Sequence, residues 1–102
     1  MSTDAAAGPF DLDAPWRPDE RVAIRPERFG ALLYHFGTRR LSFLKSPALL
    51  AVVRGLTEHP DARAACTAAG VAEAELPRYR VALAALAASQ MIQPRMIQPR
   101  SA

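Results

Sequence analysis

The chain has 102 residues, half of them hydrophobic, and a formal net charge of +3 at pH 7. This composition excludes a disordered chain and suits one small domain with a modest core. No apolar run approaches the roughly 20 residues of a membrane span, and no signal-peptide pattern opens the chain, so we expect neither. The single cysteine, Cys66, lies among alanines. We expect it to be a small buried hydrophobe in a protein of the reducing cytoplasm.

The charge is unevenly distributed. Residues 1–20 hold five acids and one arginine, a net −4, whereas the remaining chain holds twelve bases and five acids, a net +7. A basic body suggests an acidic partner, although a solubilised surface explains the charge equally well. Prolines and acids predict that residues 1–20 form an acidic, mobile N-terminal tail. Phe10 and Trp16 are compatible with docking on the body or with exposure to solvent.

Three short antiparallel strands are predicted after the tail. Their ranges, taken from alternating apolar residues and the turns between them, are 21–25, 31–36 and 40–44. Pro26 is expected to end the first strand, because proline cannot donate to a ladder. Leu32, Tyr34 and Phe36 recur at every second position and therefore share one face. Gly37-Thr38 is expected to supply the turn into the third strand.

The chain is predicted to continue as helix after Leu44, because Ser46 is a capping hydroxyl and Pro47 suits the first helical position. Helices are expected over residues 47–58, over 61–69, and from a start between 72 and 76 to about 89. They would cover one face of the sheet, which alone is only marginally stable. The predicted fold class is thus α+β, winged-helix-like. Its third strand would keep one edge free, and a free edge must be blunted or used.

The sequence MIQPR occurs twice near the C-terminus, at residues 91–95 and 96–100. A repeat of this length is too short to be a structural repeat unit. Met91 and Ile92 are expected to complete the core. The predicted domain therefore spans residues 21–95, and residues 96–102 are expected to form a loose extension.

No catalytic or metal-binding constellation is apparent in the sequence. His35 and His59 lack a second ligand at metal-like spacing. We expect His35 to pack between strands and His59 to cap a helix or lie at the surface. Cys66 lacks the electropositive, exposed setting of a nucleophile. The chain is therefore expected to have no enzymatic activity, no metal and no cofactor.

One binding hypothesis is a winged-helix DNA-binding regulator. The second helix, Gly70 and the third helix have the order of a helix-turn-helix beside a small sheet. Only Arg78, Tyr79 and Arg80 offer polar side chains at the start of the third helix, and residues 81–88 are all apolar. An apolar face cannot read base edges, so this hypothesis is kept as the alternative.

The other hypothesis uses the free edge of residues 40–44 beside the alanine-rich third helix. An extended peptide could add to this edge through main-chain hydrogen bonds, with its apolar side chains against the helix. Arg39, Arg40 and Lys45 would attract an acidic peptide. The same charges could serve only to prevent edge-to-edge aggregation. The two interpretations are even on sequence physics alone.

The run RPERFGALLYHFGTRRLSFLKSPALLAVV, residues 25–53, closely resembles the peptide chaperones of mycofactocin biosynthesis. That family is grouped with the precursor-peptide recognition elements, such as the pyrroloquinoline quinone biosynthesis protein D. The resemblance spans residues 20–93. It implies a winged-helix-like fold without enzymatic activity. It also implies that a ribosomal precursor peptide docks as an extra strand in the cleft between the third strand and the third helix. The chaperone would present the peptide to a radical S-adenosylmethionine maturase.

Carried onto this sequence, the resemblance implies a peptide-binding site with a strand side and a helix side. The strand side would comprise Arg40, Leu41, Ser42, Phe43 and Leu44. The helix side, chosen by helical spacing, would comprise Arg78, Val81, Ala82, Ala85 and Leu86. A further hypothesis is a purely structural subunit of the maturase, which would bind the enzyme and have no affinity for the peptide.

Overall fold

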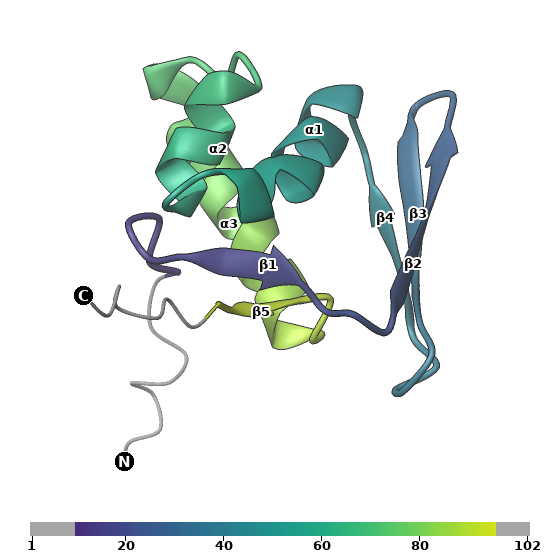
Figure 1. The fold of residues 1–102 in the computed structure, drawn as a ribbon. Helices are drawn as coiled ribbons and strands as arrows, with labels where there is room; N and C mark the ends of the chain where they lie inside the picture. The colour runs from purple at the N-terminus through teal and green to yellow at the C-terminus, as the bar shows by residue number, and fades with distance from the viewer. Residues whose placement is uncertain (1–9, 96–102) are drawn as a thin grey trace, which may run out of the picture.

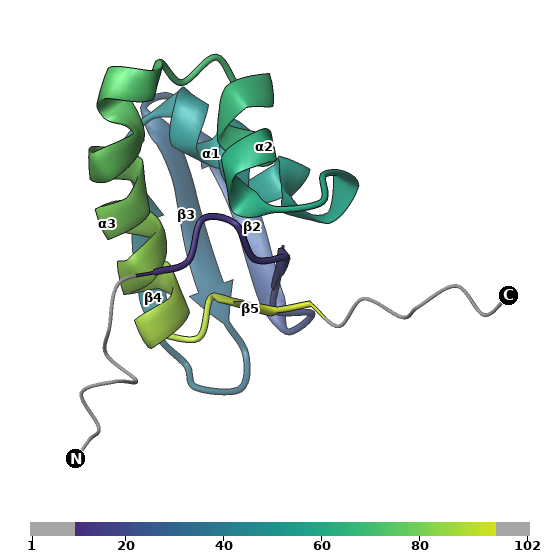
Figure 2. The same ribbon diagram turned by 90° about the vertical axis from the view of Figure 1, so that its left-hand side faces the viewer.

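The computed structural model describes residues 10–95 and shows an α+β fold (Figures 1 and 2). The strands are β1 (Trp16–Pro18), β2 (Val22–Glu27), β3 (Gly30–His35), β4 (Leu41–Leu44) and β5 (Ile92–Pro94). The helices are α1 (Pro47–Gly55), α2 (Ala62–Ala68) and α3 (Leu76–Ala88), with single 3-10 turns at η2 (Leu56–Glu58) and η3 (Glu73–Glu75). The expected three strands followed by three helices are confirmed, and β1 and β5 are additional. No helix within the described residues is long and apolar enough to cross a lipid bilayer.

The main sheet is antiparallel in the order β2-β3-β4. β2 continues through Pro26, contrary to the expectation that Pro26 ends it. The amide of Phe36 donates to the carbonyl of Arg21, and hydrogen-bonded pairs recur at every second residue from there. The pair Pro26–Ala31 falls between them, so the proline nitrogen faces the outer edge of β2 and interrupts no bond.

The turn between β3 and β4 differs in detail from the expected Gly37-Thr38 turn. The residue with positive φ is Arg39, at 64°. Gly37 is required for a different reason, because a Cβ there would lie 2.8 Å from Cε1 of His35 and 2.9 Å from Nη1 of Arg21. Close packing around the His35 ring, and not an unusual backbone angle, therefore excludes larger residues at position 37.

The helices lie on one side of the main sheet, and no element within residues 10–95 covers the other side (Figure 1). Ala31, Leu33 and His35 of β3 are fully buried on the helical side. Leu32, Tyr34 and Phe36 therefore share the opposite, outer face, as their spacing predicts. The expected start of α1 is confirmed, because Oγ of Ser46 accepts a hydrogen bond of 3.1 Å from the amide of Leu49.

The core is formed by apolar side chains of all three helices and of β3, β4 and β5. Cys66 is fully buried, as expected. Met91 and Ile92 are also buried, so the first MIQPR copy completes the core as expected. The second copy lies outside the described residues.

Residues 10–20 differ from the mobile tail expected there. Phe10 and Leu12 are buried, and the Phe10 ring stacks on Trp16 with centroids 4.3 Å apart. β1 then pairs with β5 in a separate two-stranded sheet, with Pro18 opposite Ile92. A few large apolar side chains hold this segment on the core, although it contains several prolines and acidic residues. Residues 1–9 lie outside the described residues.

Candidate functional site

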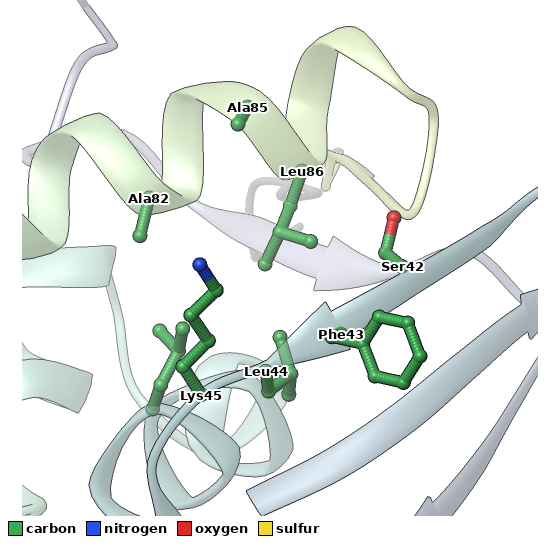
Figure 3. A pocket seen from close by; sticks show the side chains of 8 residues that line it. Ser42, Phe43, Leu44, Lys45, Ala82, Ala85 and Leu86 are labelled. Carbon is green, nitrogen blue, oxygen red and sulfur yellow. The ribbon is translucent and has the colours of Figure 1, made fainter.

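A groove runs between β4 and α3, with a volume of about 400 Å³ (Figure 3). We call it the main groove; its lining residues are Ser42, Phe43, Leu44, Lys45, Leu49, Ala82, Ala85 and Leu86. Leu86 points from α3 toward β4, and Lys45 extends from the end of β4 toward α3 (Figure 3). The alanines keep the helix surface flat, so the space beside the strand is open.

Six of the ten residues predicted for the site line the main groove together: Ser42, Phe43, Leu44, Ala82, Ala85 and Leu86. Two lining residues, Lys45 and Leu49, were not included in the predicted site. Lys45 was expected only to attract an acidic peptide by its charge, and Leu49 was not singled out. The signal was present in Ser46-Pro47, because a helix that starts there brings Leu49 one turn later beneath the end of β4.

Two smaller hollows lie at the two ends of α3. The first has a volume of about 270 Å³ and is lined by Lys45, Ser46, Leu49, Arg78, Tyr79 and Ala82. The second has a volume of about 280 Å³ and is lined by Thr38, Arg40, Ala88, Ser89 and Gln90. The predicted residues Arg78 and Arg40 therefore lie at opposite ends of α3. Leu41 and Val81 are 57% and 69% exposed and line none of these three spaces.

The outer edge of β4 has no strand partner within residues 10–95. The amide of His35 donates to the carbonyl of Arg40, and the ladder continues with Leu33 opposite Ser42 and Ala31 opposite Leu44. Hydrogen-bonded pairs alternate along an antiparallel ladder, so the main-chain groups of Ser42 and Leu44 face β3. The N–H and C=O groups of Leu41 and Phe43 consequently point away from the sheet, toward the free edge.

The charges around the groove are basic. No acidic side chain is among the residues that line the three spaces. Arg78 lies 3.5 Å from Glu75, but both side chains are largely exposed, so this ion pair is weak. Arg40 and Lys45 are exposed and form no salt bridge with the described residues.

The lining offers hydrophobic surface, main-chain groups and positive charge, and within residues 10–95 no cluster of side chains could hold a metal ion. Burial raises the pKa of the Cys66 thiol, and the Arg63 charge offsets this only in part. Cys66 is therefore neutral and enclosed, unlike a nucleophilic cysteine. The arrangement offers the groups that binding of an extended chain requires.

A buried polar cluster supports the turn that leads into β4. Nδ1 of His35 accepts hydrogen bonds from the amides of Gly37 at 2.9 Å and Thr38 at 3.0 Å. On its other side, Nε2 of His35 lies 3.5 Å from Oδ2 of Asp19. Oδ2 of Asp19 also accepts a hydrogen bond from the side-chain amide of Gln93 in β5. His35 was expected to pack between strands, but the contacts of its ring are with the turn and with the segment before β2.

Asp19 remains ionised in this setting. Burial alone would raise the pKa of its carboxyl group, but hydrogen bonds from the backbone and side chain of Arg21, together with the Arg21 charge, outweigh burial and lower that pKa to about 2. The carboxylate accepts bonds of 2.8 Å and 3.2 Å from the amide and Nε of Arg21. The carboxylate thus bonds to the residue before β2 and to β5, and it lies close to the His35 ring at the end of β3.

The matches to known proteins all identify the same family. A model of the Peptide chaperone MftB family matches residues 15–93. A relative from Mycobacterium ulcerans (strain Agy99), named "Peptide chaperone MftB", is 60% identical over 88% of this chain and 83% of its own length. Relatives of the same name from Mycobacterium tuberculosis (strain ATCC 25618 / H37Rv) and Mycolicibacterium smegmatis (strain ATCC 700084 / mc(2)155) are each 54% identical. They are covered over 84% and 93% of their lengths, and they cover 89% and 92% of this chain.

No solved structure gives a significant match. The relatives are named as peptide chaperones, which are non-catalytic, so the expectation that this chain is not an enzyme is confirmed. The chain therefore belongs to the Peptide chaperone MftB family.

Proposed function

We propose that this protein is a peptide chaperone of mycofactocin biosynthesis that binds a ribosomal precursor peptide by strand addition to β4. The observation that carries the proposal is the edge of β4 beside the main groove, which has no strand partner within residues 10–95. The peptide would be presented to a radical S-adenosylmethionine maturase, as the sequence resemblance implies. The free, buried cysteine agrees with a reducing, cytoplasmic setting.

The guest strand would bond to the outward N–H and C=O groups of Leu41 and Phe43. Side chains of a strand alternate between its two faces, so one set from the guest would enter the main groove. That set should be apolar and should contact Leu49, Ala82 and Leu86. The groove has room for it, because about 400 Å³ lies open between β4 and α3. Main-chain bonds would supply affinity, and the fit of these side chains would supply specificity.

The basic groups favour an acidic guest and oppose pairing with a second copy. In antiparallel self-pairing of two β4 edges, Arg40 of each copy would approach Lys45 of the other, and like charges at such an interface are repulsive. An acidic peptide would instead be attracted to the same residues. The DNA-binding alternative is less well supported, because α3 carries only Arg78 and Arg80 at its start and is apolar from Val81 to Ala88.

Calorimetric titration of the isolated precursor peptide tests the proposal. Ala85→Leu should fill the main groove and weaken peptide binding by about tenfold or more, with little change in melting temperature, because Ala85 is exposed. Val81→Leu is the matched control, since Val81 is exposed on α3 outside the groove. Absence of peptide binding by the unmodified chain would contradict the proposal. Retained binding to the maturase in that case would indicate the structural-subunit hypothesis.

A further inference from the structure

The uncovered face of the main sheet carries a second apolar surface that the groove does not explain. We define the outer patch as Leu32, Tyr34, Phe36, Leu41 and Phe43. Phe43 also borders the main groove, but its ring points away from α3 (Figure 3). Phe36, Leu41 and Phe43 are 62%, 57% and 59% exposed. The register places Leu32 opposite Phe43 and Tyr34 opposite Leu41, so the patch forms continuous rows across β3 and β4. The Tyr34 and Phe36 rings meet edge to face at 5.0 Å.

Such a face is unusual for an antiparallel sheet packed on one side. The solvent side of such a sheet is normally polar, with apolar residues alternating toward the core. In β3 and β4 the outward positions are apolar or aromatic as well. Contiguous apolar surface of this kind marks an interaction site in soluble proteins. In Figure 1 no element of the described chain covers this side of β2, β3 and β4.

The charges bordering the outer patch indicate the kind of partner. Arg25 lies beside the patch, opposite Leu32 in the register, and Arg28 and Arg39 occupy the turns at the two ends of the β3 strand. Glu27 is half-buried and paired with Arg25 at 2.9 Å. Arg28 and Arg39 form no salt bridge within residues 10–95. The border is thus basic, which favours a partner with an acidic border and opposes a second copy of the chain.

We propose that the outer patch docks a protein whose own apolar surface is bordered by acidic side chains, and that a bound guest strand enlarges the patch. The second part rests on the proposed function. When a guest strand adds to β4, the side chains that do not enter the main groove emerge on the outer face, next to Leu41 and Phe43. The partner would then contact the chaperone and alternate residues of its cargo together. The partner would therefore bind the peptide-loaded chaperone more tightly than the unloaded one.

The test uses the full chain and the radical S-adenosylmethionine maturase as the probe. Phe36→Ser should weaken maturase binding by about tenfold or more while leaving precursor-peptide affinity within about twofold, because Phe36 is not among the residues that line the main groove. Val81→Ser is the matched control, because it removes an equally exposed apolar side chain from α3. Arg28→Glu provides a second variant that leaves the patch intact and should weaken maturase binding through charge. Addition of the peptide should strengthen maturase binding to the unmodified chain.

Several outcomes would overturn the inference. These are no maturase binding by the unmodified chain, unchanged binding by Phe36→Ser and Arg28→Glu, or equal loss in Val81→Ser. A dimer in sedimentation that Phe36→Ser abolishes would assign the patch to a second copy, and Phe36-dependent binding to anionic vesicles would assign it to a membrane. If the peptide-loaded chaperone binds the maturase no more tightly than the unloaded chaperone, the claim that a guest strand enlarges the patch is wrong. Failure of the proposed function would give a different result. The peptide would not bind, but maturase binding would still depend on Phe36.

Discussion

Nε2 of His35 lies 3.5 Å from Oδ2 of Asp19, and both side chains are buried. Nδ1 of His35 accepts two amide hydrogen bonds, which assigns the ring proton to Nε2, facing the carboxylate. One contact therefore connects the segment before β2 with the turn that orients β4.

Replacing His35 should loosen that turn. His35→Leu keeps an apolar volume but leaves the amides of Gly37 and Thr38 without an acceptor, which should cost about 1–3 kcal/mol in the free energy of unfolding. His35→Asn supplies an acceptor close to the backbone and should recover part of the loss. Urea unfolding measures both changes, and amide exchange should accelerate at Gly37 and Thr38 in His35→Leu. Equal stability of the two variants would contradict the assigned role of Nδ1.

Acid should remove the contribution of Asp19 to stability. Its folded-state pKa is lowered to about 2 from the usual 3.8, so its stabilising effect is complete above pH 4 and is lost as the pH falls toward 2. Asp19→Asn should reduce the free energy of unfolding at pH 7 by on the order of 1–2 kcal/mol. The difference between the two proteins should shrink between pH 4 and pH 2. If the difference in the free energy of unfolding does not change with pH, the charge of Asp19 is not what stabilises the folded protein.

Two neighbouring proline substitutions should separate binding from folding. Leu41→Pro removes an N–H group that points to the free edge, so peptide affinity should fall by about tenfold or more with a small change in melting temperature. Ser42→Pro removes an N–H group from the β3–β4 ladder and should lower the melting temperature markedly. Calorimetry with the precursor peptide and thermal unfolding give the two readouts. If Ser42→Pro instead weakens peptide binding and Leu41→Pro lowers the melting temperature, the N–H group of Ser42 faces the free edge.

The thiol of Cys66 should be unreactive in the folded protein. Its side chain is fully buried, and burial raises its pKa. A thiol-specific reagent such as Ellman's should therefore modify it at the rate of unfolding, and rapidly in denaturant. Fast modification under native conditions would require an opening of the core around α2.

The strands and helices of the central part were predictable because their signals are local. Alternation in Leu32, Tyr34 and Phe36, and the Ser46-Pro47 helix start, are each contained within a few residues. The helix that follows β4 also made its free edge predictable. Helical spacing placed five residues of α3 in the predicted site, and three of them, Ala82, Ala85 and Leu86, line the main groove.

The parts that sequence reasoning missed depend on distant residues. β1 is three residues long, ends in proline, and is ordered by β5 at the far end of the domain. The contact of Asp19 with Gln93 likewise joins the two ends and leaves no local pattern. The outer patch could not be predicted from the sequence for another reason. Leu32, Tyr34 and Phe36 look like a core face in sequence, because alternation shows that residues share a face and not which face is covered.

β5 is formed by the first of two identical MIQPR copies. Deleting either copy from the gene would produce one and the same shorter polypeptide, in which Met91, Ile92 and Gln93 are still followed by proline and arginine. Loss of either copy would therefore leave every side chain of β5 unchanged. The tandem duplication therefore makes the sequence of β5 redundant.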